Sequence, residues 1–246
     1  MNYYLTGQSG FIGQAITKRL LSDGHVVLPL PRNETLTALI RLFGEQHPDY
    51  IMHLGAYGNH HFQKDFVESV ESNIIGTYNL LEAAKIFDYK RFYNFSTSSV
   101  TLKKQTYYSI TKYCGEQLAS MYKNVVNIHP YSVYGIGEAK HRFIPKVIEC
   151  LHTGESMVVD GDATHDWIYI DSFVDALFAG ETEIGTGIKT SNKEIIQMLQ
   201  YISGKKLYYV SGKVREYDND NWVAKKGVED IGIYKGLKRT YERFTV

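Results

Sequence analysis

The chain has 246 residues, of which 43% are hydrophobic and 22% are charged, values typical of a globular protein with one sizeable domain or a domain and a small lobe. Its 27 basic residues balance 27 acidic ones, which argues against a nucleic-acid-binding surface. Two cysteines make no disulfide framework, no secretory segment follows Met1, and no apolar run reaches the roughly 18 residues of a membrane span. We therefore expect a cytoplasmic protein.

Strand-like and helix-like segments alternate through the first half of the chain. This alternation predicts an α/β fold, a Rossmann-like doubly wound parallel sheet with helices on both faces. Ligands of such sheets bind at the carboxyl ends of the strands. The expected strands are 2–6, 26–30, 50–54, 91–96 and 125–128. Helices are expected over 11–22, 34–46 and 107–123, and one or two helices over 66–87.

The second half of the chain is less regular. Its pattern still indicates two short strands and three helices, with boundaries set only to within about two to four residues. The strands are expected at 157–159 and 167–170, and the helices at 143–150, 171–180 and 192–203.

Three glycines, Gly7, Gly10 and Gly13, lie between the first strand and the first helix. Glycine lets the backbone turn sharply and approach a phosphate closely, and a helix start can bind the phosphate through its free N–H groups. The strand–turn–helix context is the one a dinucleotide site requires, although a glycine-rich turn without a ligand remains the alternative.

Arg32 follows the second strand, where a fold that selects NAD usually carries an acid for the adenosine ribose. Leu30 or Pro31 occupies the acid's position, and a basic group there is typical of NADP selection. We therefore expect NADP as the cofactor, with NAD as the second choice. The alternative is that Arg32 stacks on adenine or faces solvent.

Tyr108 and Lys112 lie four residues apart on a predicted helix, a spacing that places both on one face. A free phenol has a pKa of about 10, and a nearby ammonium lowers it by favouring the phenolate. Such a pair can exchange a proton with a substrate hydroxyl, and the hydroxyl cluster Ser96–Ser99 can hold the substrate oxygen. Taken alone, the pair would more readily be interpreted as a surface contact.

Further segments match one family in order along the chain. The chain resembles an extended short-chain dehydrogenase/reductase of the NAD-dependent epimerase/dehydratase family, which works on nucleotide sugars. The resemblance covers nearly the whole chain. It rests on Thr6–Gly13, His53–Ala56, Asn73–Ala84, the helix that carries Tyr108, Lys112 and Glu116, His129–Gly135 and Gly161–Asp171.

The resemblance implies a role for each matching residue. Tyr108 would be the acid/base, Lys112 would bind the nicotinamide ribose and lower the tyrosine pKa, and Thr97 would be the catalytic hydroxyl, with Ser98 as the alternative. The implied cofactor-binding residues are Gly7, Gln8, Ser9, Gly10, Phe11, Ile12, Gly13, Arg32, Leu54, Gly55, Ala56, Asn73, Tyr108, Lys112, Pro130, Ser132 and Val133.

Departures from the family's pattern narrow the expected chemistry. Ser98 and Ser99 stand where the 4,6-dehydratases carry acids, and a hydroxyl is a poor proton shuttle near neutral pH, so dehydration is disfavoured. A 4-keto-sugar reductase or a sugar 4-epimerase remains, and Arg32 favours the reductase. The implied substrate-binding residues are Ser98, Ser132, Arg142 and His165, of which His165 replaces an arginine and Arg142 could take over the diphosphate.

We expect a dinucleotide-binding domain over 1–130, to which 165–185 return, and a small substrate-binding lobe over 131–246. The helices over 73–87 and 107–123 are those that relatives use to dimerise, so a homodimer is expected. No metal is expected, because His53, His60 and His61 lack further ligands at suitable spacing, and Cys114 is expected to pack rather than react. The rival functions are a reductase of a non-nucleotide carbonyl compound and a catalytically silent NAD(P)-binding regulator.

Overall fold

The computed structural model describes residues 1–246 except 32, 61, 103–104, 213–221 and 245–246. It divides into two compact units. The first comprises Met1–Thr101 and Gln105–His129, and the second runs chiefly from Pro130 to the end of the chain. The expected return of residues 165–185 to the first domain stays a prediction.

The first unit contains a parallel sheet whose strands run in the order β2-β1-β3-β4-β5. Because β1 lies between β2 and β3, the chain leaves β1 in one direction and returns in the other, which confirms the predicted doubly wound α/β class. The strands are β1 (Asn2–Thr6), β2 (Val26–Leu30), β3 (Tyr50–His53), β4 (Arg91–Phe95) and β5 (Val125–Pro130).

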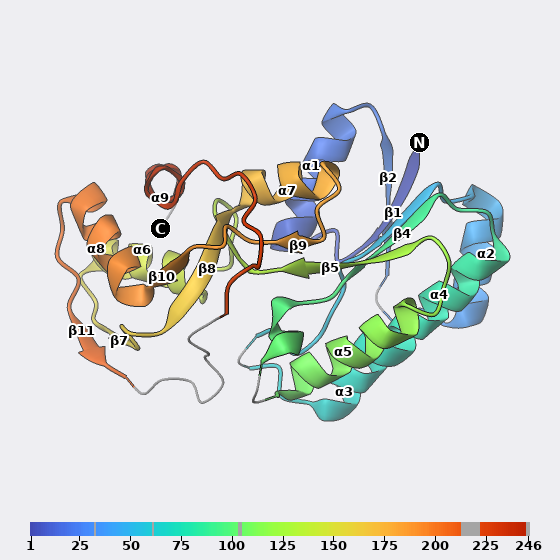
Figure 1. Cartoon of the computed structure of the whole chain (residues 1–246), viewed down its shortest axis with the longest axis horizontal. Coiled ribbons are helices and arrows are strands. Elements are labelled where there is room, and N and C mark those ends of the chain that lie inside the picture. The colour runs from blue at the N-terminus through green and yellow to red at the C-terminus, as the bar shows by residue number, and fades with distance from the viewer. Residues whose placement is uncertain (32, 61, 103–104, 213–221, 245–246) are drawn as a thin grey trace. The chain divides into compact units, whose positions relative to one another are not determined.

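Helices cover both faces of this sheet (Figure 1). Helix α1 lies on one face, whereas α2, α4 and α5 share the core cluster of the other face. That core contains Tyr4 of β1 packed edge to face against Phe43 of α2, with ring centroids 5.5 Å apart. The helices are α1 (Phe11–Ser22), α2 (Leu36–Gln46), α3 (Phe66–Val70), α4 (Gly76–Ile86) and α5 (Tyr107–Ala119), with a 3-10 turn, η2 (Ser98–Thr101).

Two helical segments have features that the sequence pattern did not specify. The segment 66–87, expected to carry one or two helices, contains α3 and α4 with a π-helical turn, η1 (Glu71–Ile75), between them. Such wider turns recur at functional sites. Helix α5 ends at Ala119 rather than at 123, because the chain turns back towards β5 with Asn124 at a φ of 59°.

The second unit has two small sheets, in the orders β10-β8-β6 and β11-β7. Strand β8 starts three residues before the expected position, and Ile170 begins a helix instead of ending the strand. In the part of the chain that the structure describes, no helix is long and apolar enough to cross a membrane. The elements are β6 (Ser132–Tyr134), α6 (Phe143–Thr153), β7 (Met157–Val159), β8 (Thr164–Tyr169), α7 (Ile170–Phe178), β9 (Glu183–Ile184), β10 (Lys189–Ser191), α8 (Asn192–Ser203), β11 (Tyr209–Ser211) and α9 (Ile233–Glu242).

Candidate active site

The glycine turn follows β1 and leads into α1. Gly7 has a φ of 68°, and its carbonyl accepts a 3.0 Å hydrogen bond from the Gly10 N–H. A Cβ on Gly13 would overlap the Gly7 carbonyl oxygen, so the turn and the helix pack this closely only with glycine. Helix α1 starts at Phe11 without a side-chain cap, and its first N–H groups suit an anion such as a pyrophosphate.

The segment after β3 lies directly against this turn. The Gly55 N–H donates a 2.9 Å hydrogen bond to Thr6 Oγ1, and a Cβ on Gly7 would lie 2.9 Å from the Gly55 nitrogen. The structure thus brings together the glycine turn and the predicted residues Leu54 and Gly55 at the carboxyl ends of neighbouring strands. Both segments belong to the expected cofactor site.

His53, the last residue of β3, is buried between two threonines. Its Nδ1 lies 2.7 Å from Thr6 Oγ1, and its Nε2 lies 3.0 Å from Thr77 Oγ1 on α4. Burial, reinforced by the Lys112 charge, lowers the pKa of His53 to about 3. The imidazole is therefore neutral at physiological pH.

The hydrogen bonds around His53 determine which ring nitrogen carries the proton. The Thr77 hydroxyl donates its only hydrogen to the Asn73 carbonyl, at 2.8 Å, so it must accept from His53. Nε2 therefore carries the hydrogen, and Nδ1 accepts from the Thr6 hydroxyl. The bonds run in one direction from the Gly55 N–H to the Asn73 carbonyl.

Asn73, in the π-helical turn η1, extends this chain of hydrogen bonds to α5. Its Oδ1 accepts from the Tyr57 N–H, and its Nδ2 donates to the Tyr57 carbonyl and to Thr111 Oγ1. Gly115 allows the close approach of the two helices, since a Cβ there would lie 2.5 Å from the Asn73 oxygen. The Asn73 amide is thus engaged with protein groups, and its direct contact with a cofactor stays a prediction.

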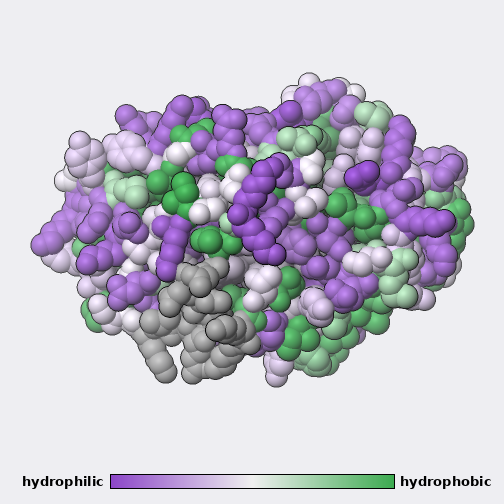
Figure 2. Space-filling model, viewed as in Figure 1, coloured by the Kyte–Doolittle hydropathy of each residue, from purple (hydrophilic) through white to green (hydrophobic). Residues whose placement is uncertain are grey.

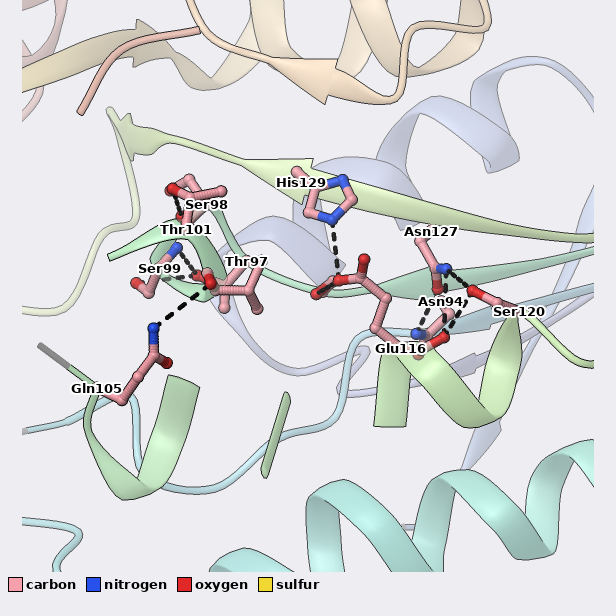
Figure 3. Close-up of polar contacts among 12 residues, drawn as sticks. Asn94, Thr97, Ser98, Ser99, Thr101, Gln105, Glu116, Ser120, Asn127 and His129 are labelled. Carbon is pink, nitrogen blue, oxygen red and sulfur yellow. Dashed lines mark hydrogen bonds and ion pairs between the residues drawn. The ribbon is translucent and has the colours of Figure 1, made fainter. Parts of the chain in front are cut away.

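Hydroxyl groups gather just after β4 (Figure 3). Thr97 and Ser98 are buried, with 8% and 3% of their surfaces exposed. Thr97 Oγ1 accepts from the Ser99 N–H and donates to Ser99 Oγ, both at 3.2 Å. Both bonds lie at the long end of the hydrogen-bond range.

Helix α5 begins with a capping box formed by Thr106 and Ser109, which fixes the turn that carries Tyr108. Gly58 packs closely against Tyr108, since a Cβ on Gly58 would lie 3.3 Å from Tyr108 Cβ. Lys112 follows one turn later and is buried. Burial lowers the pKa of Lys112 to about 8, and the Glu116 charge opposes that shift.

Several predicted residues belong to the second unit or lie outside the described residues. Pro130 ends β5, Ser132 and Val133 lie in β6, Arg142 precedes α6, and His165 lies in β8, all within the second unit by the division above. Arg32 and His61 lie outside the described residues. Among those that are described, no group of three or more His, Cys, Asp or Glu could hold a metal ion.

The structural roles of two carboxylates, Asp166 and Glu116, were not predicted from the sequence. Asp166 is buried in the second unit and accepts hydrogen bonds from Thr186, from the Gly187 N–H and from the Ala224 N–H. Glu116 was noted only as a motif match, although its spacing of four residues from Lys112 predicts an interaction on one helix face.

Comparisons with known proteins agree with this architecture. The family model for the NAD dependent epimerase/dehydratase family matches residues 3–184. CDP-abequose synthase of Salmonella typhimurium is 25% identical, over 92% of this chain and 96% of that protein. UDP-glucuronate 4-epimerase of Thermodesulfobacterium geofontis is 28% identical, over 98% and 95%.

Solved structures show the same fold. UDP-glucose 4-epimerase of Thermotoga maritima, determined with UDP-glucose, superposes with a TM-score of 0.83 at 23% identity, over 98% of each chain. The Thermus thermophilus UDP-glucose 4-epimerase, determined in complex with NAD, gives a TM-score of 0.83 at 20% identity, again over 98% of each chain.

Replacing His53 should change how stability depends on pH. The unfolded chain takes up a proton on His53 near its ordinary pKa of about 6.5, whereas the folded protein does so only at about 3. The stability contributed by neutral His53 is therefore complete above about pH 6.5 and is lost as the pH falls towards about 3. Between pH 7 and pH 5 the wild type should lose about 2 kcal/mol more unfolding free energy than His53→Gln.

Urea unfolding at the two pH values measures this difference. The matched control is His47→Asn, because His47 is exposed and its φ of 25° suits asparagine. Equal losses in the wild type and in His53→Gln would contradict the assignment of a buried neutral histidine.

Proposed function

The chain belongs to the NAD-dependent epimerase/dehydratase family, and from that premise we propose that it is an oxidoreductase acting on a nucleoside-diphosphate sugar, as a 4-keto-sugar reductase or a sugar 4-epimerase. The observation that carries the proposal is one unit holding the glycine turn, the hydroxyls after β4 and the Tyr108–Lys112 pair on α5. The names of the relatives, which include a CDP-abequose synthase and several 4-epimerases, support the same substrate class.

The residues present fit a dinucleotide. The turn at Gly7, Gly10 and Gly13, which side chains would fill, and the uncapped start of α1 would hold the pyrophosphate, and Lys112 would bind the nicotinamide ribose. When bound, the nicotinamide supplies or accepts a hydride at a sugar carbon. The proposed preference for NADP rests on Arg32, whereas several related structures were determined with NAD.

Tyr108 would move the proton. In oxidation its phenolate takes the proton of the sugar hydroxyl while the hydride leaves the carbon, and in reduction the phenol returns a proton to the keto oxygen. The Lys112 ammonium, one turn away on the same face of α5, favours the phenolate. The Thr97 hydroxyl would donate a hydrogen bond to the same substrate oxygen.

The hydroxyl cluster also supports the exclusion of dehydration. Ser98 and Ser99 are not carboxylic acids, and the Ser98 carbonyl accepts the Thr101 hydroxyl at 2.8 Å. Removal of water from a sugar needs a proton donor and acceptor that titrates near neutral pH, which neither serine provides. Ser98, Ser132, Arg142 and His165 are proposed to contact the substrate.

We also propose a homodimer. Large hydrophobic side chains are exposed on α3, η1, α4 and α5, and Figure 2 shows hydrophobic residues gathered at the lower right, where Figure 1 places α3 and α5. An exposed patch of this kind is typical of an interaction surface. The residues are Phe66, Val67, Ile75, Tyr78, Tyr107, Ile110 and Tyr113.

Replacing Tyr108 by Phe should abolish turnover, because the variant lacks the proton-transferring hydroxyl. We expect kcat to fall by about 100-fold or more across a panel of nucleoside-diphosphate sugars and their 4-keto forms, while affinity for the reduced cofactor stays within about twofold. Tyr107→Phe is the matched control, since Tyr107 is the exposed neighbour on the same helix.

Retained turnover in Tyr108→Phe would refute the assignment of the acid/base. A wild-type protein that binds cofactor but turns over no sugar nucleotide would favour the silent regulator. Turnover confined to carbonyl compounds without a nucleotide would favour the other rival.

Replacing Arg32 by Ala should weaken NADPH binding selectively. A hydrogen-bonded contact with a charged group contributes about 1.5–3 kcal/mol, so affinity for NADPH should fall by roughly tenfold or more while affinity for NADH is unchanged. Fluorescence titration with both cofactors measures the two affinities. Equal effects on NADH and NADPH, or tighter binding of NADH by the wild type, would contradict the proposed preference.

A further inference from the structure

Glu116 lies one helical turn beyond Lys112 on α5 and connects three elements of the first unit. Its Oε2 accepts a hydrogen bond from the Ser96 hydroxyl, at 2.5 Å, after β4. The same oxygen lies 2.9 Å from Nε2 of His129 in β5. Figure 3 shows the imidazole pointing towards the carboxylate. The Glu116 side chain is only 15% exposed, so these contacts are shielded from bulk water.

Glu116 is ionised in this environment. Burial acts to raise the pKa of Glu116, but the hydrogen bonds from His129 and Ser96 and the charges of His129 and Lys112 outweigh it, and the pKa lies below its usual value. An ionised carboxylate one helical turn from a buried lysine supplies negative charge that favours the ammonium away from water.

The other groups around Lys112 do not supply that charge. His53, the last residue of β3, is a neutral imidazole, and Tyr108 precedes Lys112 by one turn on the same helix. On Lys112, burial acts against the ammonium, and Glu116 is the group whose charge favours it. His129 is the titratable group that faces Glu116 from β5.

We infer that Glu116 is a positioning residue that keeps Lys112 as an ammonium ion, and that the charge on its partner His129 sets how strongly it does so. Only the catalytic consequence of this inference, the effect of Lys112 on Tyr108, rests on the proposed function. The ammonium favours the Tyr108 phenolate, and the Glu116–Ser96 bond fixes the strand end that leads to Thr97.

The charge of the side chain at position 129 determines whether the Lys112 ammonium is favoured more or less strongly by Glu116. An arginine in place of His129 would stay cationic, offset Glu116 and weaken the support for the ammonium. A neutral glutamine in its place would leave the Glu116 charge uncompensated.

The Lys112 titration can be measured directly by NMR on protein labelled with 13Cε-lysine, with the Lys112 signal identified by its loss in Lys112→Arg. In the wild type the midpoint is expected at about pH 8. Glu116→Gln should lower it by about one pH unit, since a nearby opposite charge raises an ammonium pKa by that order. Glu45→Gln, which changes an exposed helical glutamate, should leave it unchanged.

Two variants of His129 separate an electrostatic role from a packing role. His129→Arg should move the Lys112 midpoint down, in the same direction as Glu116→Gln, whereas His129→Gln should leave it in place or raise it. His129→Arg retains the carboxylate, so it decides the question even where Glu116→Gln does not fold. An unmoved midpoint in His129→Arg, or shifts of the same sign in both His129 variants, would overturn the inference.

This titration needs no substrate, so it is independent of the proposed function. Where UDP-glucose is turned over, the alkaline limb of the kcat profile should move down in Glu116→Gln together with the NMR midpoint. Shifted midpoints in a protein that turns over no nucleotide sugar would refute the proposed function and leave the role of Glu116 towards Lys112 intact. A moved NMR midpoint with an unmoved alkaline limb would refute the catalytic part of the inference.

Discussion

The candidate site depends on one buried histidine that is held neutral. His53 receives a hydrogen bond from Thr6 on one side and donates one to Thr77 on the other. Each bond can run in only one direction, because the Thr77 hydroxyl donates its single hydrogen to the Asn73 carbonyl. Protonation of the ring would place a second N–H against the buried Thr6 hydroxyl, and burial opposes it.

This chain of hydrogen bonds joins segments of the site that lie far apart in the sequence: the turns after β1 and β3, and helix α5. The Thr6 hydroxyl also accepts the Gly55 N–H, which binds the turn after β3 to the glycine turn after β1. At the other end, Asn73 donates to Thr111 on α5. A proposed cofactor turn and a proposed catalytic helix are therefore fixed to one another through buried, directional bonds, which is the preorganisation that hydride and proton transfer require.

Charge imposes the second constraint. Lys112 is buried where an ammonium is costly, and the same burial holds it beside Tyr108. A neutral His53 adds no competing positive charge, and Glu116 adds a negative one. His53 and Glu116 thus act on Lys112 in complementary ways. His53 remains uncharged, and Glu116 remains ionised.

Much of the first unit could be predicted from sequence because its signals are local. The glycine spacing after β1, the alternation of apolar strands with amphipathic helices and the Tyr108–Lys112 spacing are each contained within a short segment, and the predicted sheet class and family were confirmed. The interruption at η1 left no periodic signal, since a π-helical turn adds only one residue to a helix.

The long-range contacts could not be predicted in the same way. His53 was seen as part of a strand motif, but its tautomer depends on Thr6 and Thr77, which are 47 and 24 residues away. The role of Asp166 depends on N–H groups from segments 20 to 58 residues distant. Such bonds exist only once the fold has brought the segments together. The roles of Thr97, Tyr108 and Lys112 in catalysis stay predictions.

The most direct test of this account is the ring 15N spectrum of His53. The chain has nine histidines, and the His53 signals can be identified by their loss in His53→Gln. The account predicts a neutral ring with its hydrogen on Nε2 that does not titrate between about pH 8 and pH 5, given a pKa of about 3. A hydrogen on Nδ1, or a titration midpoint near the ordinary histidine value of about 6.5, would contradict it.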